Sequence, residues 1–281
     1  MNPIKYSFIV ILVAATSILM NISHANAAVL SQKKIEIRAG SFKMGCGVAD
    51  DRCENDEGPE GGISIFVDSF AIDQTEVTVN QYESCIKTGI CSRPKDYKRN
   101  KYCNLGHPER GEHPVNCIDW QQAVTYCTWK NGRLPFEAEW EKAARGDSKS
   151  AYPWGNEVSC KQAILDDGKT TGSVKDEHDG CGEDRTWPVK SRQANSYELY
   201  DMNGNVGEWV DNWYDKEAIP DLYATQQLDG PITGRRKVVR GGSWDENKAN
   251  LRSSFRNVKS PVSGKSVYGS IGFRCAYDIS Q

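Results

Sequence analysis

A polar turn within residues 199–215 carries the clearest chemistry in the chain, because it lies between two flanks rich in aromatic residues. Asn203, Gly204 and Asn205 adopt left-handed backbone conformations at low cost, so the chain can fold tightly there. Glu208 follows three residues later and can direct a carboxylate toward the oxygens of the turn. Ca²⁺ takes about six to eight oxygen ligands in proteins, and this turn offers only some of them. The segment therefore predicts either a calcium site or a plain turn whose side chains bond to the backbone.

Ser243 is a second candidate, in the segment RGGSW at residues 240–244. A nucleophilic serine needs a base and an orienting acid. The G-x-S-x-G pattern of serine hydrolases is absent. We therefore expect Ser243 to bond to the backbone at the end of a strand.

A third pattern contains two histidines between two cysteines, in the order Cys103, His107, His113 and Cys117. These residue types suit zinc, but their spacing matches none of its common classes. In an oxidising compartment a Cys103–Cys117 disulfide is the favoured interpretation.

An acidic loop at residues 176–184 resembles a cation-binding loop only loosely, and its last position lacks the Glu of an EF-hand. We interpret it as a solvated loop closed by a Cys160–Cys181 disulfide. No Rossmann or Walker glycine pattern is present, so we expect no nucleotide cofactor.

The N-terminus has the pattern of a signal peptide. Lys5 precedes an apolar run at residues 8–20, which is too short for a comfortable membrane span. Ala25 and Ala27 fit the small-x-small cleavage rule, so we predict a signal peptide over residues 1–27 and a mature domain over 28–281. An uncleaved anchor is the alternative. The predicted location is exported, periplasmic or secreted, with no membrane span after cleavage.

Ten cysteines follow the predicted cleavage site, and an even number in an exported chain predicts disulfides. Short spacings favour local pairs such as Cys46–Cys53 and Cys85–Cys91, although spacing alone does not determine connectivity. The formal net charge of −3 and the mixing of charges along the chain give no basis for nucleic-acid binding.

Hydrophobic alternation and capping residues predict the strands and helices that would position the candidate residues. Residues 147–198 are rich in Gly, Asp, Lys and Ser and predict irregular structure. The chain is long enough for one large domain or two small ones, and disulfides can order long loops. We therefore predict one loop-rich α+β domain, stapled by disulfides. The expected strands are residues 34–38, 40–45, 63–72, 238–244 and 271–276, and the expected helices are residues 78–86, 119–130 and 137–145.

Several segments, taken in chain order, resemble the formylglycine-generating enzyme (sulfatase-modifying factor) family. The resemblance implies a single α+β domain related to C-type lectins, poor in regular structure and usually holding calcium. The segments span nearly the whole predicted mature chain. They are residues 42–45, 76–82, 113–120, 123–127, 132–141, 152–156, the turn at Asn203, 240–244 and 272–275.

The resemblance also implies residue roles. It pairs Cys127 with Cys275, and it assigns the calcium site to Asn203, Gly204, Val206 and Glu208. Gly207 stands where the family usually has Trp, so a groove or core wall is expected to differ. A second family calcium site does not align cleanly, although Asp166, Asp179 and Asp184 lie in its region.

The oxidising members of this family bind copper through two cysteines after the Gly-Gly-Ser segment. Those positions hold Glu246 and Leu251 in this chain. Soft thiolates suit Cu(I), whereas a carboxylate is a hard donor and Leu is no ligand. We therefore expect calcium as a structural cofactor, no copper, and no formylglycine generation by the copper route.

The sequence thus favours an exported binding or accessory domain for an unidentified peptide, protein or glycan. The alternative is an oxygen-dependent oxidoreductase of the same family, formylglycine-generating or metabolite-tailoring, with a non-standard active site. Its candidate groove residues are Ser243, Glu246, Trp209 and Arg252.

Overall fold

The computed structural model describes residues 32–48, 50–95, 97–168, 180–262 and 268–279. Contacts divide the chain into residues 1–33 and 34–281, and the architecture below is that of the second unit. The predicted signal peptide, residues 1–27, lies outside the described residues. Within the described part, no helix is long and apolar enough to cross a membrane.

Short strands and helices alternate along the chain, so the predicted α+β class is confirmed. The strands are β1 (Lys34–Ile37), β2 (Gly40–Met44), β3 (Ile63–Val67), β4 (Phe70–Asp73), β5 (Gly207–Trp213), β6 (Lys237–Arg240), β7 (Arg256–Lys259), β8 (Ile271–Gly272) and β9 (Ala276–Asp278). The α-helices are α2 (Val79–Lys87), α3 (Trp120–Trp129) and α4 (Glu137–Arg145), with several single helical turns between them.

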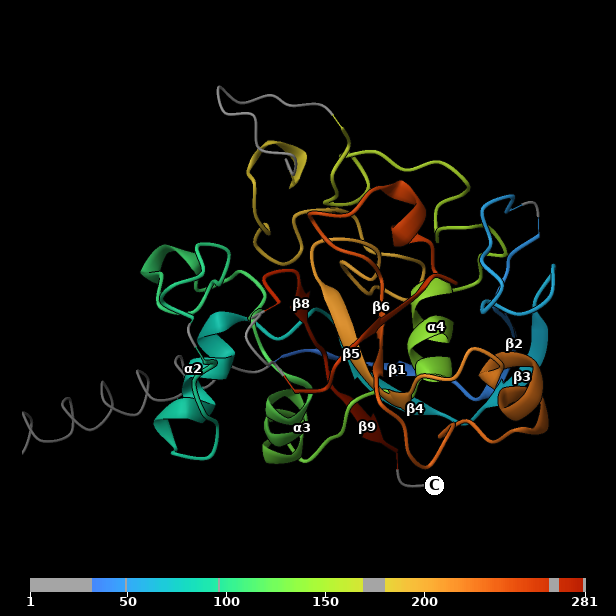
Figure 1. Ribbon diagram of the computed structural model, residues 1–281, viewed down its shortest axis with the longest axis horizontal. Coiled ribbons are helices and arrows are strands. Elements are labelled where there is room, and N and C mark those ends of the chain that lie inside the picture. The colour runs from blue at the N-terminus through green and yellow to red at the C-terminus, as the bar shows by residue number, and fades with distance from the viewer. Residues whose placement is uncertain (1–31, 49, 96, 169–179, 263–267, 280–281) are drawn as a thin grey trace, which may run out of the picture. The chain divides into compact units, whose positions relative to one another are not determined.

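Three sheets organise the strands. The four-stranded sheet has the order β7-β6-β5-β8, with β5 antiparallel to β6 and parallel to β8. A three-stranded sheet has the order β1-β4-β9, and β2 pairs with β3 in a hairpin. Figure 1 shows α4 beside β5 and β6. The turn at Asn203 leads directly into β5, one of the two inner strands of the largest sheet.

Each helix begins or ends at a residue that its sequence marks. Thr78 and Asp119 accept hydrogen bonds from the N3 backbone amides of α2 and α3, and both form capping boxes. Gly146 ends α4 with a φ of 57°, a conformation that glycine adopts without steric cost.

Helix α4 is buried along its whole length, charged residues included. Its carboxylates meet buried arginines from the four-stranded sheet: Glu141 pairs with Arg240, and Glu137 with Arg256 at 2.7 Å. Buried charges need such partners, because an isolated charge loses its hydration without compensation. These pairs fix α4 against the sheet.

All ten cysteines are oxidised, which confirms the prediction of disulfide bonding. The pair Cys127–Cys275 joins α3 to the segment before β9 across 148 residues of sequence. The other four disulfides close shorter loops: Cys46–Cys53, Cys85–Cys91, Cys103–Cys117 and Cys160–Cys181.

Some strand predictions were wrong in extent. The expected strand at 63–72 is two strands, because the chain leaves the β2 hairpin after Val67 and pairs with β1 and β9 from Phe70. The expected strand at 271–276 likewise divides into β8 and β9, in different sheets. The strand expected at 238–244 ends at Arg240, and β5 and β7 were not predicted.

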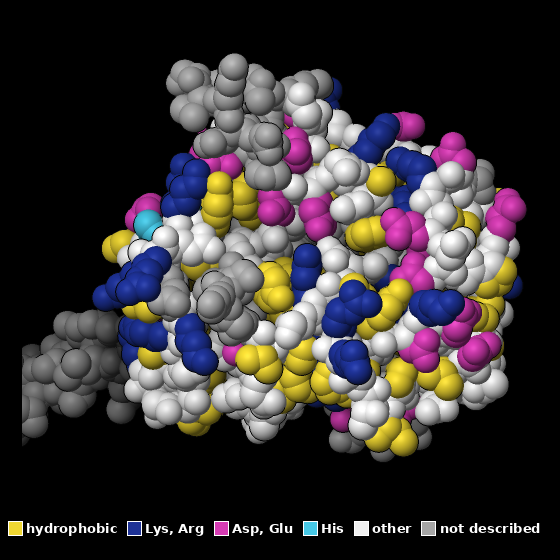
Figure 2. Space-filling view, viewed as in Figure 1, with side chains coloured by type: hydrophobic (Ala, Val, Ile, Leu, Met, Phe, Trp, Pro, Cys, Tyr) yellow, Lys and Arg dark blue, Asp and Glu magenta, His cyan; other side chains and the backbone are white. Residues whose placement is uncertain are grey.

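Surface charge is of mixed sign on the face shown in Figure 2, where Lys and Arg side chains are interspersed with Asp and Glu side chains. That distribution agrees with the small formal net charge of −3.

Candidate functional site

The turn at residues 203–206 has the tight backbone that its composition predicts. Gly204 and Asn205 have φ angles of 102° and 63°. The Gly204 amide donates to the Gly241 carbonyl at 2.8 Å, and the Asn205 amide donates to the Ile164 carbonyl at 2.9 Å. A Cβ on Gly204 would lie 2.4 Å from the Ile164 oxygen, so only glycine fits there.

The two asparagine side chains of the turn point to different partners. Asn203 Nδ2 donates to the Leu251 carbonyl at 2.7 Å and to Ser253 Oγ at 3.1 Å. Asn205 Oδ1 accepts from the Trp187 amide, and its Nδ2 donates to Glu76 Oε1 at 3.0 Å. Among the described residues, Asn203 Oδ1 is buried without a hydrogen-bond partner.

Glu208, at the start of β5, is fully buried and accepts hydrogen bonds from two residues. Arg274 Nε contacts both carboxylate oxygens, at 2.9 and 2.8 Å, and Arg274 Nη2 donates to Oε1 at 2.7 Å. Trp140 Nε1 donates to Oε2 at 2.8 Å. This geometry anchors the strand to α4 and to the segment before β9.

Glu76 and Asp201 join Glu208 in a group of three carboxyls around Arg274. Burial and the negative charge of Asp201 raise the pKa of Glu76 well above its usual value, against the opposing charge of Arg274. Burial also raises the pKa of Asp201, to about 6. Within the described part of the chain, Glu76 Oε2 is a second buried oxygen without a partner.

These oxygens provide a test of fit for the calcium ion that the resemblance implies. In the described part of the chain, Asn203 Oδ1 and Glu76 Oε2 are buried oxygens without partners, and oxygen is the ligand type that calcium prefers. Glu208, in contrast, already accepts from Arg274 and Trp140. The turn therefore offers oxygen ligands to a hard cation, whereas the carboxylate of Glu208 is already held by other donors. Sequence reasoning missed Glu76, Asp201 and Arg274 here, although Glu76 opens one of the motifs that carry the resemblance.

Gly207, at the position where the resemblance implies Trp, packs closely against the neighbouring strand. A Cβ on this residue would lie 2.9 Å from Val239 Cγ1 on the neighbouring strand β6. A larger side chain would therefore displace Val239.

Ser243 and Glu246 lie together beyond the end of β6. The sequence predicted that Ser243 bonds to the backbone, and this prediction was wrong. Ser243 Oγ donates instead to Asp245 Oδ1 at 2.6 Å. Glu246 Oε1 accepts from Asn257 Nδ2 at 2.9 Å. Burial and the adjacent Asp245 raise the pKa of Glu246 to about 7, while Ser243 and Asn257 favour its charged form.

Arg252 and Trp209, the other two groove candidates, lie elsewhere. Arg252 donates through its two terminal guanidinium nitrogens, Nη1 and Nη2, to Glu57 at 2.6 Å, and through Nη1 to Asp50 at 3.1 Å. Trp209 is buried and donates to the Ile118 carbonyl. The structure therefore brings together only Ser243 and Glu246 of the four.

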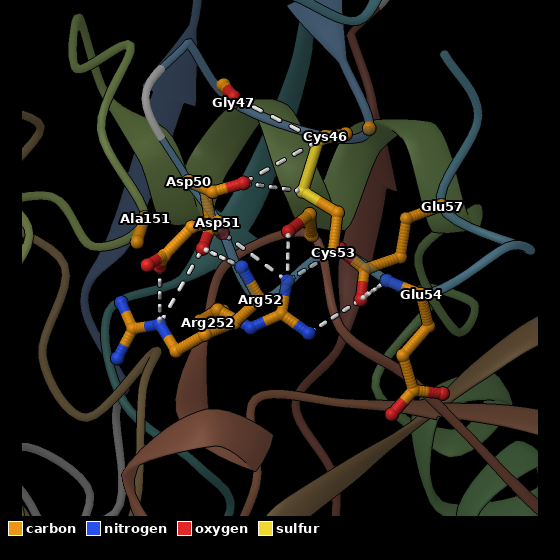
Figure 3. Close-up of a disulfide and its surroundings, with 12 residues drawn as sticks. Cys46, Gly47, Asp50, Asp51, Arg52, Cys53, Glu54, Glu57, Ala151 and Arg252 are labelled. Atoms are coloured by element: carbon orange, nitrogen blue, oxygen red, sulfur yellow. Dashed lines mark hydrogen bonds and ion pairs between the residues drawn. A yellow bond between two sulfur atoms is a disulfide. The ribbon is translucent and has the colours of Figure 1, made fainter. Parts of the chain in front are cut away.

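Arg252 anchors the loop that carries the Cys46–Cys53 disulfide, which Figure 3 shows with Asp50, Arg52 and Glu57 around it. One ligand atom from each of Asp50, Cys53 and Glu57 lies within 4.8 Å of the others. The Cys53 sulfur is disulfide-bonded and both carboxylates bind Arg252, so these atoms are already committed. A polar hollow of about 860 Å³ opens beside this loop.

Copper, in contrast to calcium, does not fit the donors present. Leu251 is buried at 0 % exposure, and Glu246 presents a carboxylate. All ten cysteines are in disulfides, so the chain offers no thiolate to Cu(I) in this state.

The remaining candidate ligands are held by other interactions. Cys103 and Cys117 form a disulfide, and His113 Nδ1 lies 2.9 Å from Thr186 Oγ1. Burial and the charge of Arg110 lower the pKa of His113 to about 4. Of the second calcium candidates, Asp166 accepts from the Gly168 amide and Asp184 pairs with Lys101, while Asp179 lies outside the described residues. The acidic loop at 176–184 is described only from residue 180.

Comparisons with known proteins agree on one family. The model of the sulfatase-modifying factor enzyme 1-like domain matches residues 22–279. The formylglycine-generating enzyme of Mus musculus is 31 % identical over 290 residues, covering 88 % of this chain and 75 % of that protein. The inactive C-alpha-formylglycine-generating enzyme 2 of Bos taurus is 35 % identical over 176 residues, and the match covers 61 % of this chain and 52 % of that protein.

Among solved structures, PvdO from Pseudomonas aeruginosa is similar, with a TM-score of 0.69 and 26 % identity. The match covers 89 % of this chain and 95 % of that structure. The similarity therefore extends over the whole fold rather than over one motif.

Proposed function

Because this chain belongs to the family of sulfatase-modifying factor enzyme 1-like domains, we propose that it is an exported, calcium-stabilised binding or accessory domain. In this proposal the chain does not generate formylglycine by the copper route. The name of the cattle relative shows that the family includes an inactive member.

One observation carries the proposal, namely the chemistry at the two positions where the oxidising members have copper-binding cysteines. Leu251 is buried and apolar, and Glu246 is held by Asn257. No free thiol is present to take their place. A Cu(I) ion that prefers soft sulfur ligands has none here.

The direct test is an oxidation assay with a cysteine-containing peptide, added copper and oxygen, in which the peptide is followed by mass spectrometry. The formylglycine-generating enzyme of Mus musculus serves as the positive control. We expect conversion by the control and none by this chain. Turnover by this chain would overturn the proposal.

Calcium binding at the turn is supported by the tight backbone at Gly204 and by Asn203 Oδ1, which has no hydrogen-bond partner among the residues that the structure describes. The ligand set proposed from the resemblance is Asn203, Gly204, Val206 and Glu208. When bound, the ion would tie the turn to the sheet. A ligand that binds only the native state raises the melting temperature, so melts with calcium and with chelator should differ. Identical melts, with no calcium in elemental analysis, would contradict this part.

Export is proposed from the N-terminal pattern at residues 1–27. Disulfide bonding of all ten cysteines supports it, because disulfides persist in oxidising compartments. N-terminal sequencing of the protein expressed with its own leader should begin at Ala28. A chain that retains Met1 would point to the uncleaved anchor.

An oxygen-dependent oxidoreductase with a non-standard site is the second candidate. The observation that favours it is Glu246, whose pKa near 7 suits a group that exchanges protons at neutral pH. If the chain oxidises any substrate, Glu246→Gln should abolish turnover without changing the melting temperature by more than a few degrees. Activity that survives this substitution would exclude Glu246 as its acid or base.

A further inference from the structure

Two hollows adjoin beside the loop that Arg252 anchors. One has a volume of about 860 Å³ and the other of about 500 Å³. Both are lined by Cys53, Glu54 and Asn55. The two hollows therefore form one continuous groove over these three residues, which we call the loop groove. Its lining is mostly polar, whereas sites for small apolar ligands are lined mainly by hydrophobic side chains.

Acidic side chains outnumber basic ones along the loop groove. Five acidic residues line the larger hollow, against Arg52 and Lys248. Three acidic residues, Glu54 among them, line the smaller hollow, against Lys216. Each of these three basic side chains already has an acidic neighbour within 4.0 Å. The groove therefore presents a surplus of negative charge to a ligand.

Glu54 and Glu60 carry much of this surplus. Both residues are exposed, and neither carboxylate has a hydrogen bond or an ion pair among the described residues. Figure 3 shows the Glu54 carboxylate directed away from Arg52 and Arg252. These two carboxylates are available to a ligand, in contrast to Asp50, which Arg252 holds.

The spacing of the carboxylates favours a ligand with separated charges over a single metal ion. In the part of the chain that the structure describes, the ligand atoms of one group of acidic or cysteine side chains lie within 4.8 Å of one another. That group is Asp50, Cys53 and Glu57. Its atoms are committed to Arg252 and to the disulfide. Glu54 and Glu60 belong to no such group, whereas a calcium ion needs about six to eight oxygens around one point.

The floor of the loop groove is fixed before any ligand binds. Arg252 binds Glu57 at 2.6 Å, and the Cys46–Cys53 disulfide closes the loop. A preorganised site loses less conformational entropy on binding. Asn55 is exposed where the two hollows meet, and its amide can donate to a peptide carbonyl and accept from a peptide N–H. A polyamine would supply positive charge to the groove but no peptide group to Asn55.

We propose that the loop groove binds an extended polypeptide segment that carries Lys or Arg side chains. Glu54 and Glu60 pair with the basic side chains, and Asn55 bonds to the backbone of the segment. Arg suits this role because its guanidinium can bind a carboxylate through two hydrogen bonds. This inference rests on the proposed binding or accessory role and names the class of partner.

Fluorescence polarisation on the full, oxidised chain at pH 7.5 tests the proposal. The probes are labelled peptides of Gly and Ser that carry two Arg residues at different spacings, each with a matched peptide in which Gln replaces Arg. We expect at least one spacing to bind about tenfold more tightly than its Gln analogue. Its affinity should fall as the salt concentration rises, because salt screens exposed charges.

Variants locate the binding site. Glu54→Gln with Glu60→Gln should weaken binding of the best Arg peptide about fivefold. Glu36→Gln with Glu83→Gln removes the same charge from β1 and α2, outside the groove, and should change the affinity by less than about twofold. Asn55→Ala should weaken binding of the peptide but not of spermidine. These side chains are exposed or half-exposed, so the melting temperatures should stay close to that of the wild type.

The outcomes separate this inference from the proposed function. Equal binding of Arg and Gln peptides at every spacing, or wild-type affinity in the variant without Glu54 and Glu60, would overturn the loop groove as a site for basic segments. Tighter binding of spermidine than of any peptide would overturn the assignment to a polypeptide. These results would leave the proposed accessory role intact. The peptides contain no cysteine, so turnover in the separate copper assay would refute the proposed function without bearing on the groove.

Discussion

Buried carboxyls in this protein differ according to the partner that each one has. Burial acts to raise the pKa of Glu137, but the charges of Arg256 and Arg240 outweigh it, and the pKa falls below its usual value. Asp73 has no guanidinium on its carboxylate; it accepts from the Cys275 amide and from Tyr277 Oη, both at 3.1 Å. Burial therefore prevails at Asp73 and raises its pKa to about 7.

Asp73 should make stability depend on pH. A carboxyl whose folded pKa lies above its unfolded value of 3.8 binds its proton more tightly in the native state. Its contribution, about 4 kcal/mol for this difference, is fully present below pH 4 and is lost as the pH rises through 7. Asp73→Asn should flatten this slope in urea unfolding between pH 4 and 8. The exposed variant Asp221→Asn should keep it, and a slope unchanged in Asp73→Asn would refute this assignment.

Arg274 should contribute more to stability than other single residues near the turn. It binds Glu208 and three backbone carbonyls, those of Asp73, Gln74 and Tyr200. Removing one partner of a buried ion pair costs about 3 to 5 kcal/mol, since the other charge is left without compensation. We expect a loss of this size for Arg274→Met in urea unfolding at pH 7. A loss below about 1 kcal/mol, comparable to an exposed ion pair such as Lys216–Glu217, would show that Glu208 finds another partner.

At the scale of elements, the disulfides should differ in what they contribute. Cys127–Cys275 spans 148 residues and connects α3 to the last strands, whereas Cys46–Cys53 spans 7. The loop-entropy model gives about 5 kcal/mol for the long loop and about 2.5 kcal/mol for the short one. Replacing Cys127 and Cys275 by Ala should therefore destabilise the protein by roughly twice as much.

The matched control is the Ala replacement of Cys46 and Cys53, because Arg252 holds that loop through Asp50 and Glu57 without the disulfide. Chemical unfolding of both double variants measures the difference. Equal losses would mean that the crosslink of α3 does not restrict the unfolded chain.

Local signals were enough to predict the helices and the first two strands, but they did not suffice for the later strands. Thr78, Asp119 and Gly146 mark helix ends through bonds that lie within a few residues. The sequence of strand β5 carried no strand signal and was interpreted as part of a turn with aromatic flanks. Most residues of β5 are buried on both faces of the sheet, so polar and apolar side chains do not alternate along it. The break after Val67 depends on pairing with β1 and β9, which are distant in sequence.

The candidate site shows the same limit. The turn and its left-handed backbone follow from Asn and Gly, whereas Glu76 and Arg274 reach it from segments about 130 and 70 residues away in the chain. Arg252 follows the Ser243 segment closely in sequence, yet its guanidinium binds Asp50 and Glu57 some 200 residues earlier. Partners of buried charges are set by packing, which a single sequence does not reveal.

At the scale of the whole molecule, covalent crosslinks hold together a chain with little regular structure. The five disulfides close loops with sequence separations of 7, 6, 14, 148 and 21 residues. The loop-entropy model gives roughly 15 kcal/mol for the five together. That total equals or exceeds the stability of a typical domain, about 5 to 15 kcal/mol.

The fully reduced chain should therefore be unfolded at neutral pH and 37 °C. Reduction followed by alkylation, with near-ultraviolet circular dichroism as the measurement, should remove the signal of the buried tryptophans Trp140, Trp209 and Trp244. Alkylation reagent added to the oxidised chain is the control and should leave the spectrum unchanged. A reduced chain that kept its near-ultraviolet signal would show that packing alone holds the fold, and the disulfides would then no longer argue for assembly in an oxidising compartment.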